Sequence, residues 1–352
     1  PNAIDEPTAP QLWQALEERC QSTQGCRVLA IPHNTNLSLG GGFLLPEASA
    51  QDRARRARFE RLLEVHQHKG SSECYPGIGL SDEACAYEIA LPTPMLARAN
   101  ALTLADRLQI SRGYLRHGLA TGLQELQRDG SNSMQFGVIG STDSHAGRAG
   151  YTDEANWQGT FGRYDADPQR RRSASLLPYN PGGLAGVWAS ANTRAAIFDA
   201  LHQRETFATS GPRIHLRLFA SPAPAQASCE TAAEDHRSTM MGGTLTRRNI
   251  TAPPVFFLEA LPDRAPLANL AIVRLRLKDG AVEQRLFQYP SSGPHRGSTC
   301  WRFEDRNFDP NLPTLWYARV LEVPTPSWRH TAETPELLQE RAWSSALWYE
   351  PR

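Results

Sequence analysis

Three short apolar segments, each followed closely by side chains that can bind a metal ion, constrain the fold of this chain most strongly. They are residues 27–31, 62–67 and 136–140, and helical patterns separate them. Short apolar runs between helices are typical of the buried parallel strands of α/β proteins. In such folds the loops at the carboxyl ends of the strands form the functional site. We therefore expect an α/β architecture, either a parallel sheet or a β/α barrel, with its site at those strand ends.

The helical patterns between these segments have recognisable boundaries. Thr8 and Gln11 resemble a capping box, which predicts that a helix begins there. Residues 52–62 form an arginine-rich helical stretch, and residues 97–128 keep a helical periodicity up to Gly130.

The pattern changes to strands beyond about residue 213. Four strands are predicted there, at residues 214–219, 255–260, 271–277 and 282–288. We expect two domains: a β/α barrel portion over residues 1–212, and a β-rich, sandwich-like domain over residues 213–352.

Charge and hydropathy argue against two classes of partner. The 352 residues include 37 basic and 37 acidic side chains, so the formal net charge is zero. Binding to nucleic acid or to an anionic membrane surface usually relies on a sustained positive field, which this chain lacks. No apolar stretch approaches the roughly 20 residues that a membrane-spanning helix needs. We expect neither nucleic-acid binding nor a membrane span.

The six cysteines form two close pairs and one distant pair along the chain: Cys20 and Cys26, Cys74 and Cys85, Cys229 and Cys300. The absence of a CxxC motif disfavours a structural zinc site. Three disulfides, the distant one assigned by elimination, are typical of a periplasmic or secreted protein. Other pairings, or six reduced thiols, are the alternatives.

Asp143 and His145 follow the third apolar segment, where a carboxylate and an imidazole two residues apart can converge on one cation. His33 follows the first segment, and Glu64 lies in the second. An N/O ligand set of this kind suits zinc, manganese or iron rather than calcium. Glu64 has two alternative roles, which are to orient a ligand or to pair with an arginine.

Nearby side chains leave further alternatives open. His66 and His68 would form a ligand pair if both faced one side of a strand, but a turn after Gln67 would break that geometry. Lys69 either forms a buried ion pair with Glu73 or binds a substrate anion.

Arg213 offers two similar interpretations. Its guanidinium group either holds a phosphate or carboxylate in a bidentate manner or caps a neighbouring group.

Six motifs give the chain a resemblance to a known family. They are Ile-Pro-His-Asn at 31–34, Glu-Val-His-Gln-His-Lys-Gly-Ser-Ser-Glu at 64–73, Gly-Ser-Thr-Asp-Ser-His at 140–145, Arg-Glu-Thr-Phe-Ala-Thr-Ser-Gly-Pro-Arg at 204–213, Met-Gly-Gly at 241–243 and Glu-Arg-Ala-Trp-Ser-Ser at 340–345. The chain resembles domain of unknown function family 3604 (DUF3604). That family is itself similar to the polymerase and histidinol phosphatase (PHP) superfamily of metal-dependent phosphoesterases.

The resemblance implies a distorted β/α barrel with a metal cluster at the carboxyl ends of its strands. It implies that His33, Asp143 and His145 are metal ligands. Such proteins open with an Asp-Leu-His-x-His-Thr type segment, which is missing here. We therefore expect the chain to be the C-terminal part of the fold, completed by an upstream segment or by a separate chain.

The candidate site follows from the motifs and the resemblance together. The catalytic candidates are Asp143, Lys69 and Arg213; the substrate-binding candidates are Asn34, Glu73 and Ser141; the metal-ligand candidates are His33, Glu64, Asp143 and His145. The expected function is a metal-dependent hydrolase that acts on a phosphoester or related ester through a metal-activated water. The expected substrate is small and anionic. The alternative is a non-catalytic PHP-like scaffold that binds a surface polymer or partner.

A segment of 36 residues, from Gly147 to Gly182, lacks clear periodicity. It starts two residues after His145 and carries aromatic and arginine side chains. Long irregular loops of this kind are usually functional or disordered. We expect the loop to cover the metal site, and the alternative is a solvated insertion.

Overall fold

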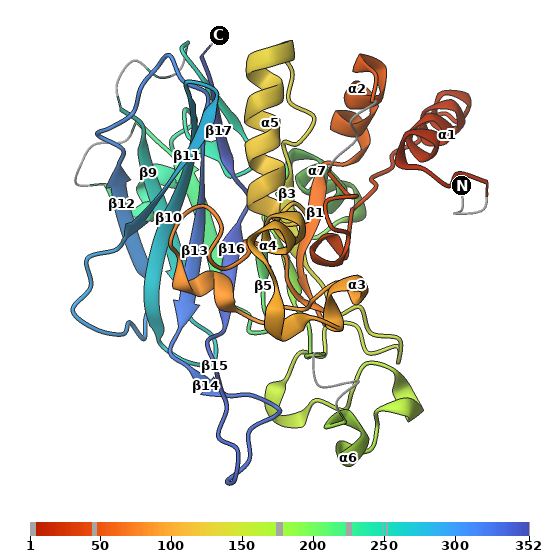
Figure 1. Ribbon diagram of the computed structural model, residues 1–352. Helices are drawn as coiled ribbons and strands as arrows, with labels where there is room; N and C mark the ends of the chain where they lie inside the picture. The colour runs from red at the N-terminus through yellow and green to blue at the C-terminus, as the bar shows by residue number, and fades with distance from the viewer. Residues whose placement is uncertain are drawn as a thin grey trace.

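The structure is a computed structural model that describes residues 5–43, 48–173, 179–222, 227–248, 250 and 253–351. It is a mixed α/β molecule with several sheets, and strands dominate its C-terminal half. In Figure 1 the helix α5 stands between the large sheet on one side and helices α1 and α2 on the other.

The helices are α1 Ala9–Ser22, α2 Ala50–Phe59, α3 Thr93–Leu96, α4 Leu104–Ser111, α5 Leu115–Asp129, α6 Pro168–Arg171, α7 Arg194–Gln203 and α8 Cys229–Ala233. The strands before residue 213 are β1 Leu62–Gln67, β2 Gly70–Ser71, β3 Gly137–Gly140, β4 Leu184–Val187 and β5 Thr206–Thr209. The later strands are β6 His215–Ala220, β7 Thr239–Met240, β8 Thr244–Thr246, β9 Val255–Leu261, β10 Leu267–Lys278, β11 Ala281–Gln288, β12 Thr299–Glu304, β13 Thr314–Glu322, β14 Thr325–Pro326, β15 Leu337–Leu338, β16 Arg341–Ser344 and β17 Leu347–Glu350.

A small sheet of order β2-β1-β3 holds two of the predicted strands. β1 and β3 are parallel, with Leu62 opposite Gly137, so their carboxyl ends meet at one edge. Both strands are almost entirely buried, and β1 carries Glu64, His66 and Gln67 among its apolar residues.

The strand predicted at residues 27–31 is not formed. This extended segment runs beside β1 with two backbone hydrogen bonds, from Ala30 N to Phe59 O and from Glu64 N to Pro32 O. The apolar side chains of residues 28–31 are partly buried, although the segment forms no regular ladder of strand hydrogen bonds.

The large sheet has the order β11-β10-β13-β16-β5-β4, and β17 and β8 extend it beside β13. β4 and β5 precede residue 213, yet β5 pairs with β16 near the end of the chain. The sheet therefore crosses the boundary expected between the two domains. One apolar core contains Val65 of β1, Leu119 of α5 and Trp343 of β16, so both halves of the chain share it.

The strand β3 lies against β4 and β5 of the large sheet. A Cβ atom on Gly140 would lie 2.7 Å from the carbonyl oxygen of Thr209 and 2.8 Å from that of Leu184. Glycine at this position permits the close approach. No closed barrel is found among the strands that the structure describes, so the predicted barrel is not confirmed.

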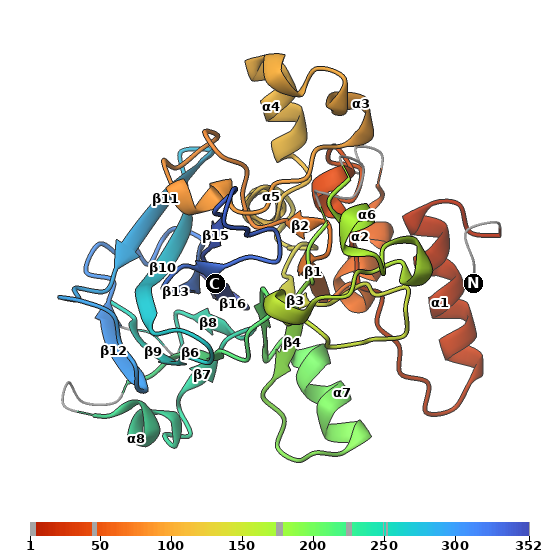
Figure 2. The ribbon, with the colours of Figure 1, turned by 90° about the horizontal axis from the view of Figure 1, so that it is seen from below.

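A second sheet of order β12-β9-β6-β7 faces the large sheet (Figure 2). Their facing side chains form a second apolar core, with Leu218 and Leu258 from the second sheet and Ile272 and Trp316 from the large one. Two sheets packed over a shared apolar layer form a sandwich.

The predicted helices form with shifted boundaries. Thr8 and Gln11 make the predicted capping box of α1. The single helical stretch expected over residues 97–128 is broken into shorter helices, because Tyr114 is extended and starts α5 afresh. No helix in the described part of the chain is long and apolar enough to cross a bilayer.

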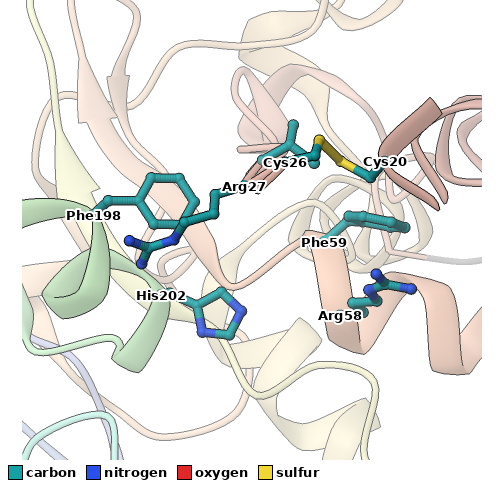
Figure 3. Close-up of a pocket in the computed structure, with 8 residues that line it drawn as sticks. Cys20, Cys26, Arg27, Arg58, Phe59, Phe198 and His202 are labelled. Atoms are coloured by element: carbon teal, nitrogen blue, oxygen red, sulfur yellow. A yellow bond between two sulfur atoms is a disulfide. The ribbon is translucent and has the colours of Figure 1, made fainter. Parts of the chain in front are cut away.

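All three predicted cysteine pairs are disulfides: Cys20–Cys26, Cys74–Cys85 and Cys229–Cys300. The Cys20–Cys26 bridge borders a cavity of about 220 Å³, in which the side chains of Arg27, Phe198 and His202 lie close together (Figure 3).

Candidate metal centre

The loop after β3 brings three metal-competent side chains together. One ligand atom from each of His68, Asp143 and His145 lies within 4.8 Å of the other two. His68 follows β1 and the other two follow β3, so the group sits where the two parallel strands end. Asp143 and His145 thus lie near His68 at the ends of two neighbouring strands, and their role as metal ligands stays a prediction.

The backbone of Asp143 orients both imidazole rings. The Nδ1 atoms of His68 and His145 each lie 3.0 Å from the carbonyl oxygen of Asp143. A ring that donates through Nδ1 to a carbonyl leaves its Nε2 free as a metal ligand, which is a common arrangement in metal sites. Asp143 adopts a left-handed φ of 47°, a conformation that aspartate tolerates better than most residues.

Burial suits His68 to this role. Its ring is fully buried, and its Nε2 has no hydrogen-bond partner while lying 3.5 Å from the Asp143 carboxylate. Burial lowers the pKa of His68 to about 4, an effect that the nearby Asp143 carboxylate only partly opposes. The ring is therefore neutral at pH 7, as a metal ligand must be.

A chain of polar contacts adjoins this group. The Lys69 ammonium lies 3.6 Å from Asp143 Oδ2 and donates to Asn34 Oδ1 at 3.1 Å. Asn34 Oδ1 also accepts a hydrogen bond from Gln67, whose amide also donates to Glu64 at 2.9 Å. Of the two alternatives for Lys69, the ion pair with Glu73 is not formed, because the Lys69 ammonium lies beside Asp143.

Glu64 and His33, both predicted ligands, lie outside the three-residue group. The Glu64 carboxylate accepts hydrogen bonds from Ser141 and Gln67. Burial raises the pKa of Glu64, and the hydrogen bonds from Ser141 and Gln67 oppose this increase. His33 itself is exposed. Ser141, predicted to bind substrate, is thus tied to Glu64.

Glu73 has a structural environment instead of the predicted substrate-binding one. It is 1% exposed and accepts hydrogen bonds from Arg116, Arg319, Tyr317 and Trp343. Every one of these donors is buried, so the carboxylate holds the core together and faces no open site.

Arg213 is exposed, and its backbone nitrogen donates to Asp263 at 2.7 Å. In the described part of the chain, no contact joins its guanidinium group to the histidine–aspartate group. Its predicted catalytic role stays a prediction.

The loop predicted as a cover folds back onto the site (the lime segment around α6 in Figure 1). His145 N donates to Thr160 O at 2.9 Å. The ring of Phe161 lies 5.3 Å from that of His145, and the ring of Tyr179 lies 5.1 Å from that of His68. Residues 174–178 of this loop lie outside the described part of the chain.

The sequence analysis named His68 as one member of a possible ligand pair but did not include it among the metal-ligand candidates. His66 and His68 formed a possible ligand pair, but the structure directs His66 toward Glu88, 3.5 Å away, and His68 toward Asp143. The chain turns at His68 and Lys69, between β1 and β2. A turn directly after Gln67 therefore separates the two histidine side chains.

Fold and site together define a mixed α/β protein with a histidine–aspartate group of metal-ligand spacing at the ends of two parallel strands. The family model described as "Protein of unknown function (DUF3604)" matches residues 2–298 and 282–351. The chain belongs to this family, as its motifs suggested. No curated protein matches the chain.

Proposed function

We propose that this protein is a metal-dependent hydrolase that acts on a phosphoester or related ester. The observation that carries the proposal is the group of His68, Asp143 and His145, whose ligand atoms lie within 4.8 Å of one another. Its donor set of two imidazoles and one carboxylate fits zinc, manganese or iron. The buried and unpartnered Nε2 of His68 supports this fit, because a bound ion would satisfy it.

A divalent ion held here would supply Lewis acidity that activates water for attack on an ester. The side chains around the ion would bind the substrate, offset negative charge and accept a proton. The Lys69 ammonium, 22% exposed, attracts an anionic substrate and offsets the negative charge that develops during attack. Asn34 holds Lys69 in place through its side-chain oxygen. Asp143, beside this ammonium, is positioned both as a ligand and as a proton acceptor.

The cover loop restricts access of solvent to the site. Phe161 packs against the rings of both His68 and His145, with centroids 5.6 and 5.3 Å away. Excluding water on this side strengthens the electrostatic interactions between the site and an anionic substrate. A PHP-like arrangement belongs to the proposal, and the parallel pairing of β1 and β3 supports it.

The proposed location is the periplasm or the outside of the cell. Three disulfides support this location, because such bonds persist in oxidising compartments and are rare in the cytosol.

The test is hydrolysis of a generic phosphomonoester and phosphodiester by protein supplied with manganese or zinc. We expect metal-dependent turnover, and we expect Asp143→Asn to remove it. The matched control is Asp279→Asn, because Asp279 also has a left-handed φ, of 51°, but lies in the β10–β11 turn. Equal turnover by Asp143→Asn and Asp279→Asn would reject the site. Absence of both metal and turnover would favour the non-catalytic scaffold.

A further inference from the structure

A group of buried carboxylates lies around Tyr87, apart from the group at Asp143. Glu88 follows the disulfide-linked loop 74–85, and Glu340 directly precedes β16. The Tyr87 hydroxyl donates to Glu340 at 3.0 Å, and Glu88 follows Tyr87 directly in the chain. Both carboxylates are withdrawn from solvent, with the Glu88 side chain 5% exposed and Glu340 2% exposed.

An unpartnered imidazole points at this group. His66 is fully buried, and neither of its ring nitrogens has a hydrogen-bond partner. Its Nε2 lies 3.5 Å from Glu88 Oε2. Two ligands of one tetrahedral ion at about 2.0 to 2.2 Å are separated by roughly 3.3 to 3.6 Å, so this pair has ligand spacing. Oε1 of Glu88 and Oε1 of Glu340 are also buried without a hydrogen-bond partner.

The nearby cations are engaged elsewhere. The Arg329 guanidinium lies 2.6 Å from Glu336 and 3.9 Å from Glu88. Arg341 donates to the carbonyl oxygen of Ala84 at 2.7 Å. Glu154, a third buried carboxylate of the group, accepts a hydrogen bond from the Trp328 backbone at 2.7 Å. The arginines thus leave the unpartnered oxygens of Glu88 and Glu340 without a direct donor. Burying such groups costs free energy unless a cation or proton binds them.

One member of the group faces a cleft. Glu88 and Tyr87 line a cleft of about 900 Å³ between the disulfide-linked loop and the large sheet.

We propose that His66, Glu88 and Glu340 form a second cation site, which binds a divalent metal ion of the zinc or manganese class. His66 and Glu88 already have ligand spacing, and Glu340, which accepts a hydrogen bond from Tyr87, would supply the third ligand after a rotation of its side chain. The mixed N/O donors exclude a preference for calcium or magnesium. This site goes beyond the proposed hydrolase activity and does not depend on it.

The experiment measures cobalt(II) and zinc binding by chelator-stripped protein that carries Asp143→Asn and His145→Ala, so that the first group is silenced. We expect about one equivalent of metal to bind, and Glu88→Gln to weaken its affinity at least about tenfold. The matched control is Glu322→Gln, because Glu322 is also a buried carboxylate, 1% exposed, but lies on β13 outside the group. His66→Gln serves as the second variant if Glu88→Gln does not fold.

The outcomes separate the possibilities. Cobalt absorption bands that vanish in Glu88→Gln and persist in Glu322→Gln would support the site. Lack of metal binding by the silenced protein, or equal affinity in Glu88→Gln and Glu322→Gln, would overturn it and leave protons as the occupants. The result is independent of hydrolysis, since failure of the first site leaves this measurement unchanged.

Discussion

His68 and His145 direct their Nδ1 atoms at the same atom, the carbonyl oxygen of Asp143, each at 3.0 Å. The two rings come from different strand ends, yet one peptide group sets the orientation of both. Because this contact uses the backbone of Asp143, the side chain of that residue can be changed without removing it. The proposed metal ligand and the ring-orienting group can therefore be tested separately.

Asp143→Asn keeps the backbone carbonyl and removes the anionic ligand. We expect metal affinity to fall by about ten- to a hundredfold, while the melting temperature of the metal-free protein stays nearly unchanged. Isothermal titration with zinc, together with thermal unfolding in chelator, measures both. Asp279→Asn should bind zinc as the unmodified protein does. A large loss of metal-free stability in Asp143→Asn would show that the carboxylate has a structural role instead.

Phe161→Ala removes the ring that packs on both histidines of the group. We expect a higher KM for phosphodiesters and faster loss of metal to a chelator, because His145 loses its support. Tyr164→Ala is the control, since Tyr164 lies in the same loop but is 65% exposed. Unchanged kinetics in Phe161→Ala would mean that the loop does not act as a cover.

Glu73→Gln should destabilise the protein by about 3 to 5 kcal/mol, because it removes one of the two carboxylates that the buried Arg116 and Arg319 share. Denaturant unfolding measures this loss. Glu283→Gln breaks a more exposed ion pair with Arg276 and should cost about 1 kcal/mol or less. Similar losses for the two variants would contradict the structural role assigned to Glu73.

Acid should unfold the protein through the same residue. Burial alone would raise the pKa of Glu73, but Arg319 and Arg116, with hydrogen bonds from Tyr317 and Trp343, hold it well below its usual 4.5. A carboxylate whose pKa is lowered by folding stabilises the protein above its unfolded pKa and loses that contribution as the pH falls. We expect stability to drop below about pH 4.5, and Glu73→Gln to show a shallower drop. Parallel pH profiles for the two proteins would refute this assignment.

The Cys74–Cys85 bridge should contribute more than its own loop entropy. It fixes the loop that carries Asp82, whose carboxylate pairs with Arg116 at 2.6 Å and with Arg319 at 2.7 Å. The double variant Cys74→Ser Cys85→Ser should lose about 2 to 3 kcal/mol from loop closure, plus a further loss from these ion pairs. The Cys20→Ser Cys26→Ser variant, which opens a shorter and more exposed loop, is the comparison. An equal loss in both would argue against the link to the ion pairs.

Local patterns predicted local structure well. The strand predicted at residues 62–67 is β1, and the predicted strands at 271–277 and 282–288 lie in β10 and β11. The run 27–31 failed because an apolar segment can bury its side chains without a partner strand. In the site, Asp143 and His145 were recognisable from their spacing.

The surroundings of Glu73 and His68 depend on residues that are distant in the sequence. Glu73 meets Arg319 and Trp343 across 246 and 270 positions of the chain, and no local motif encodes these contacts. The choice of His68 over His33 as a partner of Asp143 likewise follows from tertiary placement. Contacts between residues so far apart in the chain form only when the sheets pack together, so the sequence alone does not indicate them.

Anomalous X-ray scattering at the zinc edge, from crystals grown with zinc, shows whether the histidine–aspartate group binds a metal ion. We expect a peak about 2.0 to 2.2 Å from Nε2 of His68, Nε2 of His145 and a carboxylate oxygen of Asp143. The same crystals of Asp143→Asn should show a weaker peak or none. A zinc-loaded crystal with no peak between these three side chains would rule out this metal site.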